Sequence, residues 1–194
     1  MGRKLEFSRE KALNTAMESF WAQGYDATSM RELASRLGLH LGSVYNALGD
    51  KEKVFEAALK LNIEEHVMPP MKALAEDGNP LVALDRHLNK VVEECSEPAG
   101  SNGCFVINSL LEIASINESI SHTLRDYMMR VEECFTRCIE NARKLGQIPS
   151  DRDPQKYAHS IMATCFAMRA MAKLQAPKEV LQNVRDCAYR ALIA

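Results

Sequence analysis

The sequence predicts an all-α protein, and three features of its composition and pattern support that fold class. Glycine and proline, which interrupt regular structure, number only 9 and 7 among 194 residues. Apolar side chains recur every three or four positions, the period of an amphipathic helix, and strand-like alternating runs are missing. The hydrophobic content of 46% is ample for a core. The length fits one ordinary domain, or a small domain followed by a medium one.

Charge and targeting signals narrow the class of protein further. The formal net charge of −2 gives no bulk attraction to nucleic acid, so any such function must rest on a local motif. No run of about 18 apolar residues is present and MGRKLEF lacks a signal-peptide core, so we expect a cytoplasmic protein with no membrane partner. In that compartment thiols stay reduced. The six cysteines concerned are Cys95, Cys104, Cys134, Cys138, Cys165 and Cys187.

The N-terminal part predicts a short arm and a helix. Residues 1–8 carry Arg3 and Lys4, and they are either a frayed end or an arm that contacts the DNA backbone. A helix is expected from Ser8 or Arg9 to about residue 23, with Gly24 ending it.

Residues 28–55 contain two short helical patterns separated by a tight turn. Thr28 precedes the first apolar stripe and is a good N-cap, since its hydroxyl can accept a bond from a free amide of the first turn. Gly38 suits the left-handed residue that ends such a helix. A second helix over about 39–45 would pack on the first. The anchoring residues are Leu33, Ala34, Leu37, Leu39 and Val44.

Helix, tight turn and helix together predict a helix-turn-helix, whose second helix enters the major groove of DNA. A helix this short is unstable alone, so it needs such a partner. Small residues would let the backbone approach DNA, while Tyr45 and Asn46 can donate hydrogen bonds to phosphates or base edges. Lys51 begins the next helix and places a cation beside free amides, where a phosphate could sit. The outward residues are expected to be His40, Leu41, Gly42, Ser43, Tyr45 and Asn46.

This stretch resembles the DNA-binding domain of the TetR family of bacterial transcriptional regulators. The matching residues are Thr28, Arg31, Leu33, Ala34, Gly38, Gly42, Ser43, Val44, Tyr45, Lys51, Glu52, Val54 and Phe55. His40, Leu41 and Leu48 depart from the family pattern, and the first two leave operator identity open. The resemblance implies DNA contacts from Thr28, Ser29, Arg31, His40, Leu41, Gly42, Ser43, Tyr45, Asn46 and Lys51.

Six further helices are expected after the helix-turn-helix, which makes nine in all. Their approximate ranges are 51–66, 81–95, 104–116, 118–145, 154–174 and 178–193. Breaks are expected at Met68-Pro69-Pro70, at Gly78-Asn79-Pro80 and in a loop over 97–103. In the helix over 104–116, the expected buried face comprises Val106, Ile107, Leu110, Leu111 and Ala114.

The resemblance also implies how the chain is divided and what each part does. Residues 1–48 would bind DNA, residues 49–194 would bind an effector and dimerise, and a rigid helix over 51–66 would link them. The family resemblance implies a homodimer that acts as a repressor on a palindromic operator and is released by a small-molecule effector. The expected effector residues are Cys104, Asn108, Glu112, Tyr127, Met128, Met162 and Phe166. The expected dimer residues are Tyr157, Ile161, Cys165, Met168, Val180, Val184 and Ala188.

Cys104 supports an alternative form of regulation. Gly103-Cys104-Phe105 resembles a stretch of one broad group of TetR-like regulators, in some of which a cysteine here responds to electrophiles or oxidants. A thiol at a helix N-terminus has a lowered pKa and forms a nucleophilic thiolate. Cys95 would be its resolving partner. The simpler interpretation is that Cys104 is a small buried apolar residue.

Other classes of protein have weaker support. No paired carboxylates, nucleophile–histidine pair, phosphate loop or cofactor motif is visible, so we expect no enzyme and no cofactor. Cys134 and Cys138 share a helix face but lack nearby histidines, so packing is preferred to a metal site. A helical protein-interaction module stays open, and it predicts that changes at Tyr45 and Lys51 leave function intact.

Overall fold

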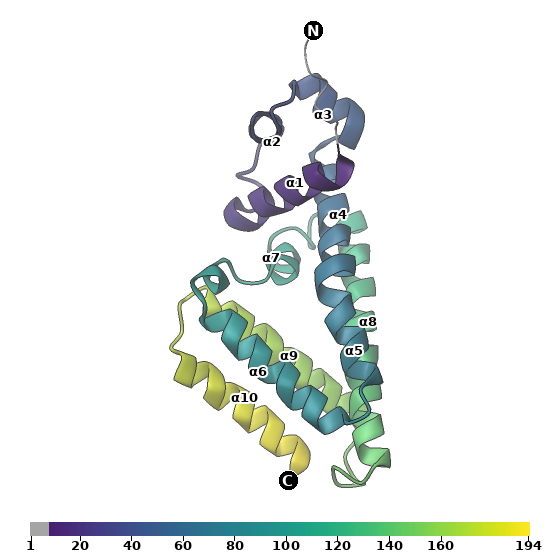
Figure 1. Cartoon of the computed structure of the whole chain (residues 1–194). Helices are drawn as coiled ribbons and strands as arrows, with labels where there is room; N and C mark the ends of the chain where they lie inside the picture. Colours follow the sequence, from purple (N-terminus) through teal and green to yellow (C-terminus); the bar gives the residue numbers. More distant parts are fainter. Residues whose placement is uncertain (1–7) are drawn as a thin grey trace.

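The computed structural model describes residues 8–194, except for the side chains at positions 99 and 101, and all regular structure in that range is helical. This confirms the all-α prediction. Arg3 and Lys4 of the expected N-terminal arm lie outside the described residues. Figure 1 shows three short helices at one end of the molecule and long helices running away from them to the C-terminal end.

The first helix forms where its cap and stripe predict it. α1 (Arg9–Gln23) begins after Ser8, whose side chain accepts a hydrogen bond from the amide of Lys11. Gly24 ends it with φ of 87°, a backbone conformation that favours glycine. Its buried side chains, Phe20 among them, pack mainly on α4.

α2 (Met30–Leu37) begins one residue later than the sequence suggests. The side chain that accepts the Glu32 amide is Ser29, at 3.1 Å, so Ser29 is the N-cap. Thr28 is fully buried, and its hydroxyl donates instead to the carbonyl of Gly24 at 2.8 Å. The expectation that Thr28 caps the helix is therefore wrong.

The turn after α2 has the geometry that Gly38 predicts. Gly38 is left-handed with φ of 66°, and Leu39 donates its amide to the carbonyl of Ala34 at 3.0 Å. α3 (Leu41–Leu48) follows, three residues longer at its C-terminal end than expected. Val44 and Leu48 are its buried side chains.

A long helical rod joins the two ends of the molecule. α4 (Lys51–Asn62) continues through a π-helical turn (Ile63–Val67) into α5 (Met68–Glu76). Met68-Pro69-Pro70 was expected to end or kink the helix, but the prolines lie in the first turn of α5, where a missing amide costs least. If α4, the π-helical turn and α5 are counted as one helix, the described part of the chain has nine α-helical units, which is the predicted number.

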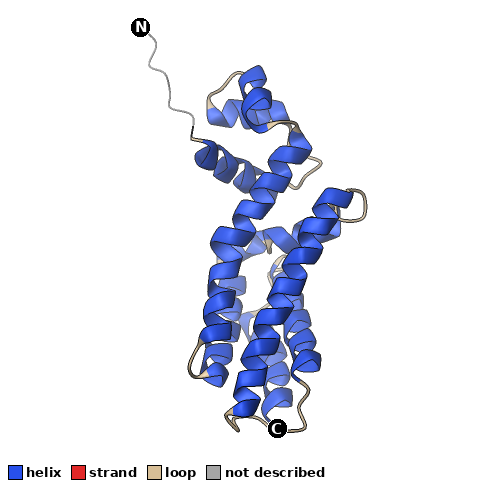
Figure 2. Cartoon of the chain, turned by 90° about the vertical axis from the view of Figure 1, so that its right-hand side faces the viewer, coloured by secondary structure: helices blue, strands red, loops and turns tan. Residues whose placement is uncertain are grey.

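The remaining helices form the larger part of the molecule. α6 (Pro80–Ser96) starts within the expected Gly78-Asn79-Pro80 break, with Asn79 as its N-cap, and a 3-10 turn (Pro98–Asn102) leads to α7 (Phe105–Glu112). α8 (Glu118–Lys144), α9 (Pro154–Ala172) and α10 (Lys178–Ile193) then pack with α6 and α5. Figure 2 shows these long helices below the small N-terminal group.

α7 is shorter than the helix expected over 104–116, and its buried face was partly wrong. Val106 and Ile107 are buried, but Leu110 and Leu111 are 37% and 74% exposed. Phe105 is buried in their place.

Among the described residues, no helix is long and apolar enough to cross a membrane.

Candidate DNA-binding surface and effector cavity

The outward face of α3 presents small and polar side chains. Gly42, Ser43 and Asn46 are exposed, and Tyr45 is 45% exposed, while Val44 is fully buried on the opposite side. His40, at the N-cap, makes no side-chain capping bond, and its imidazole is exposed. No carboxylate lies within α3, so the face can approach a phosphate backbone without like-charge repulsion from its own side chains.

Three of the predicted DNA-binding residues have other surroundings. Thr28 is fully buried and cannot contact DNA. Leu41 is only partly exposed and packs against the core, so it is not a freely outward residue. Lys51 donates to the carbonyl of Asp26 at 3.2 Å and lies 4.4 Å from the ring centre of Tyr25. Ser29 and Arg31 are exposed, as a contact to DNA requires.

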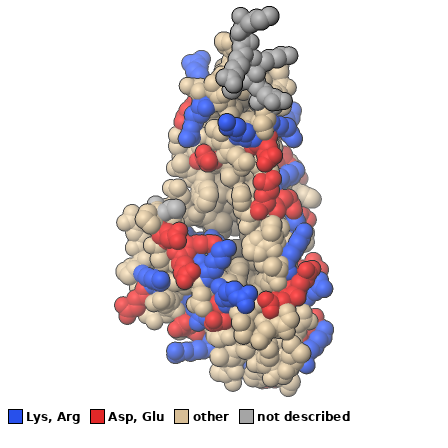
Figure 3. Space-filling view, in the orientation of Figure 1, with Lys and Arg blue, Asp and Glu red and all other residues tan. Residues whose placement is uncertain are grey.

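Charge on the molecular surface is mixed. Figure 3 shows Lys and Arg side chains interspersed with Asp and Glu on the face it presents. This mixture agrees with the net charge of −2. Surface charge therefore does not mark a DNA-binding face, and the evidence for one comes from the shape and hydrogen-bonding groups of α3.

A cavity of about 340 Å³ lies beneath the N-terminal helices. Side chains of α4, α5, α6, α8 and α9 line it, and so do the π-helical turn and Trp21 of α1. Four predicted effector residues, Cys104, Tyr127, Met162 and Phe166, are among the lining residues. A largely apolar cavity with a few polar groups is the usual form of a small-molecule site.

The other three predicted effector residues lie elsewhere. Asn108 donates to the carbonyl of Asn102 at 2.8 Å and accepts from Lys173 at 3.2 Å. Met128 lines a separate surface groove between α8 and α9. Glu112 contacts the N-terminal helices instead of the cavity.

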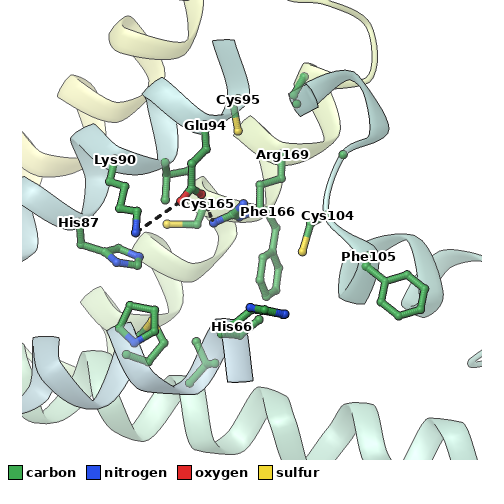
Figure 4. Close-up of a pocket in the computed structure, with 18 of the residues that line it drawn as sticks. His66, His87, Lys90, Glu94, Cys95, Cys104, Phe105, Cys165, Phe166 and Arg169 are labelled. Atoms are coloured by element: carbon green, nitrogen blue, oxygen red, sulfur yellow. Dashed lines mark hydrogen bonds and ion pairs between the residues drawn. The ribbon is translucent and has the colours of Figure 1, made fainter. Parts of the chain in front are cut away.

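The polar groups of the cavity come from α6 and α9, and the sequence did not predict them. Arg169 donates to Glu94 at 3.1 Å, and Lys90 lies 3.7 Å from the same carboxylate (Figure 4). Desolvation, helped by Arg169 and Lys90, lowers the pKa of His87 to about 4, so its imidazole is neutral at pH 7. No spacing in the sequence marks these residues, because only the packing of α6 on α9 brings them together.

Three cysteines reach the same cavity. Cys104 is the N-cap residue of α7 and is partly buried, while Cys95 and Cys165 are buried. Burial raises the pKa of Cys95, and it raises the pKa of Cys165 to about 12. Cys134 and Cys138 are buried elsewhere, and no cluster of three or more metal-binding side chains occurs in the described part of the chain.

A polar joint connects the cavity region to the helix-turn-helix. Glu112, at the end of α7, accepts hydrogen bonds from the amides of Tyr25 and Asp26 at 2.7 and 3.2 Å. A Cβ added to Gly24 would lie 2.8 Å from a Glu112 oxygen, so a larger residue there would displace the Glu112 carboxylate. Trp21 donates its indole N–H to the carbonyl of Gly103 at 3.1 Å. We call these contacts of Trp21, Tyr25 and Asp26 with Gly103 and Glu112 the α1–α7 joint.

Aromatic packing reinforces this joint. The ring of Phe55 in α4 lies 4.9 Å from Phe20, 5.0 Å from Tyr25 and 5.6 Å from Phe105 of α7. All three arrangements are edge-to-face, the geometry that aromatic pairs favour. The N-terminal helices are therefore packed directly on the part of the chain that encloses the cavity.

Comparison with known proteins identifies the family. The family model described as bacterial regulatory proteins, tetR family, matches residues 12–58, and the one described as tetracyclin repressor-like, C-terminal domain, matches residues 80–188. The chain belongs to the TetR family. Its helix-turn-helix is accordingly that of a DNA-binding transcriptional regulator, and the predicted fold and family are confirmed.

Individual TetR family relatives span almost the whole chain. The HTH-type transcriptional regulator YezE of Bacillus subtilis (strain 168) is 26% identical over 99% of this chain and 100% of its own length. The HTH-type transcriptional repressor ComR of Escherichia coli (strain K12) is 25% identical over 97% of this chain and 90% of its own length. A cysteine mutant of the TetR family regulator CifR, solved with 26bp operator DNA, is 26% identical over 97% of this chain and 99% of its own chain. Its TM-score is 0.76.

In the TetR family fold of this chain, α9 and α10 each have one buried and one outward face. Ile161, Cys165 and Met168 are buried inside the single chain, so the expectation that they form a dimer surface is wrong for these three. Tyr157, Val184 and Ala188 are partly exposed, and Val180 is 38% exposed. The exposed small or polar residues include Ser160, Ala163, Ala167 and Ala170 on α9, and Asn183, Cys187 and Ala191 on α10.

Proposed function

We propose that this TetR family member is a homodimeric repressor that binds a palindromic operator and is released by a small-molecule effector. The observation that carries the proposal is the α1–α7 joint, because it connects the cavity wall to the DNA-binding helices. Residues 1–48 bind DNA, and residues 49–194 bind the effector and dimerise. Two relatives support this assignment: ComR is a transcriptional repressor, and CifR is a regulator complexed with operator DNA.

The dimer is proposed from the outward faces of α9 and α10. Small side chains such as Ala163 and Ala167 allow two helices to approach closely. One α3 offers few base contacts, and two-fold symmetry doubles them on half-sites roughly 34–36 Å apart. The dimer thus provides the affinity that one short helix lacks.

Release is proposed to act through the joint. A ligand in the cavity contacts Trp21 on α1 and the wall that holds Cys104, so it can favour a different tilt of α1 relative to α7. That tilt changes the separation of the two α3 helices. The effect on DNA affinity is limited by the ligand's difference in affinity for the two states.

The test begins with selection of bound sequences from a random duplex pool, followed by anisotropy titration of the selected duplex at two salt concentrations. We expect a palindrome bound by two chains. Asn46→Ala should weaken binding at particular base pairs, whereas Arg31→Gln, at an exposed position of α2, should weaken all sequences and lower the salt slope by about 1. The matched control is Arg137→Gln, which is exposed on α8. Absence of any enriched palindrome rejects the proposal and favours the interaction-module alternative.

A second candidate function is favoured by the position of Cys104. Its side chain lines the cavity at the first turn of α7, next to the joint, so a covalent adduct would act where an effector acts. We expect a thiol-reactive electrophile to release the operator from the wild-type protein and not from Cys104→Ser. Equal release from both proteins excludes Cys104 as the sensor.

A further inference from the structure

The charged end of the cavity has two cations that share one carboxylate. Glu94 accepts a hydrogen bond from Arg169 at one oxygen, and its other oxygen lies 3.7 Å from the ammonium of Lys90. Figure 4 shows all three side chains turned toward one another between α6 and α9, with His87 beside them. Glu97, which is exposed at the start of the 3-10 turn, is the other acidic residue in the lining.

Arg169 has hydrogen-bonding capacity that its protein contacts do not use. A guanidinium carries five N–H donors. In residues 8–194 the bond to Glu94 is the one hydrogen bond that Arg169 donates. Its side chain is 27% exposed, so the remaining donors are largely withdrawn from bulk water.

His87 adds a second donor group without a protein partner. Its ring packs edge-on against Phe135 at 5.5 Å, and within the described residues it makes no hydrogen bond. A neutral imidazole carries one N–H donor and one acceptor. Arg169 and His87 therefore face the cavity with donors available, which is the arrangement that recognises an oxyanion.

We propose that the effector is a small apolar molecule that carries one anionic acid group, such as a carboxylate, bound by Arg169 and His87. This proposal rests on the proposed function, because it names the ligand class of the same cavity. The apolar body of the ligand packs on Met162, Phe166 and Phe105, which also line the cavity.

The shared carboxylate explains how Arg169 becomes free to bind the ligand. When its guanidinium turns to the incoming anion, Glu94 keeps Lys90 as a partner, and its side chain, 43% exposed, also keeps contact with water. A cationic ligand meets the opposite situation, since it would have to compete with both Arg169 and Lys90 for Glu94. The site thus selects by charge, and charge-assisted hydrogen bonds supply the preference.

The experiment uses three probes of one shape and different charge: 2-naphthoate, 2-naphthamide and 2-naphthylmethylammonium. Trp21 is the single tryptophan of the chain and lines the cavity, so its fluorescence reports occupancy. We expect 2-naphthoate to bind the full-length protein about tenfold or more tightly than the other two, the size of one charged hydrogen bond. No saturable change with 2-naphthoate at millimolar concentration, or equal or tighter binding of either other probe, overturns the proposal.

Two variants test the role of the charged groups in opposite directions. Arg169→Met should abolish the preference for 2-naphthoate, while Glu94→Gln should tighten its binding several-fold because Arg169 loses its competitor. Arg86→Met is the matched control, because Arg86 lies on α6 with Glu94 but is 70% exposed and outside the cavity. Weaker binding of 2-naphthoate to Glu94→Gln overturns the proposal even if Arg169→Met does not fold.

Operator anisotropy separates this proposal from the proposed function. If 2-naphthoate binds with the expected variant pattern but leaves operator affinity unchanged, the ligand class is supported and release by this cavity is rejected. If no palindromic operator is selected, the repressor function fails whatever the fluorescence shows.

Discussion

His87 shows how one side chain can make stability depend on pH. Its folded-state pKa of about 4 lies below the usual 6.5, so between these values the unfolded chain binds the extra proton. The stability that it contributes is present above pH 6.5 and is lost as the pH falls towards 4. The cause is desolvation together with the nearby charges of Arg169 and Lys90.

We expect the wild-type protein to lose about 2 kcal/mol more stability than His87→Gln when the pH changes from 7 to 5. Urea unfolding at both pH values measures the difference. His122→Gln, at an exposed position, should behave as wild type. If His87→Gln and the wild-type protein respond equally, His87 is not the group that titrates.

The cysteines should differ in reactivity because only the thiolate reacts. Burial raises the pKa of both Cys138 and Cys165 to about 12, so about one molecule in ten thousand carries either thiolate at pH 8. Cys104 is partly exposed, and Cys187, although exposed in the single chain, lies on the proposed dimer face of α10. Timed labelling with iodoacetamide, followed by mass spectrometry, should modify Cys104 before Cys138 and Cys165. In urea all six should react alike, and fast native labelling of Cys165 contradicts the burial argument.

At the level of the helical elements, two neighbouring residues before α2 have different roles: Ser29 caps the helix, and Thr28 holds a buried hydroxyl. Ser29→Ala removes the oxygen that accepts the Glu32 amide, which should cost about 1 kcal/mol and reduce hydrogen-exchange protection at that amide. Thr28→Val removes the bond to Gly24 and should cost about 1–2 kcal/mol without affecting the cap. Thr28→Ser, which keeps the hydroxyl, is the control. The opposite protection pattern would restore Thr28 as the cap.

The same helices show what the sequence could and could not predict. Gly38, Asn79 and Gly24 mark helix ends correctly because caps and turns are set by local backbone geometry. The ends of α7 and the outward position of Leu111 were missed, because an apolar run does not reveal which face meets a neighbour. Burial in the structure resolves this ambiguity.

The effector cavity was predictable in part for the same reason. Cys104, Tyr127, Met162 and Phe166 were expected on apolar character and family resemblance, and all four line it. Arg169 and Glu94 are 75 positions apart and form their pair only when α9 packs on α6. Glu112 was assigned to the cavity, although its partners are backbone amides of the turn between α1 and α2, which no side-chain pattern reports.

At the scale of the whole molecule, Glu112 should determine how strongly the two ends are coupled. Glu112→Ala frees the amides of Tyr25 and Asp26 but leaves the cavity lining intact. We expect unchanged ligand binding by Trp21 fluorescence and a several-fold smaller effect of that ligand on operator affinity. Glu18→Ala, exposed on α1, is the control. Full coupling in Glu112→Ala would show that the effect travels by another route.

Dimerisation through α9 and α10 gives a separate prediction. Ala167 is exposed on α9, so Ala167→Glu should fold normally and yet place two charges against each other across the proposed interface. Sedimentation velocity should show monomers, and operator affinity should fall with the loss of the second half-site. The control is Ala73→Glu, which makes the same change at an exposed position of α5, away from the proposed interface. A dimeric Ala167→Glu protein places the interface on another surface.

The π-helical turn (Ile63–Val67) between α4 and α5 has a consequence for insertions and deletions. A π turn amounts to one residue more than an α-helix would use, and Asn62, His66 and Val67 around it line the cavity. Removing one residue from the regular parts of the rod, in α4 or α5, would shorten it by about 1.5 Å and rotate everything on its N-terminal side by about 100°. The recognition helix α3 would then no longer face its own DNA half-site. A wide turn can absorb a one-residue change locally, so single deletions within Ile63–Val67 should be tolerated better than single deletions in α4 or α5, even though none of these positions lies on the DNA-binding surface.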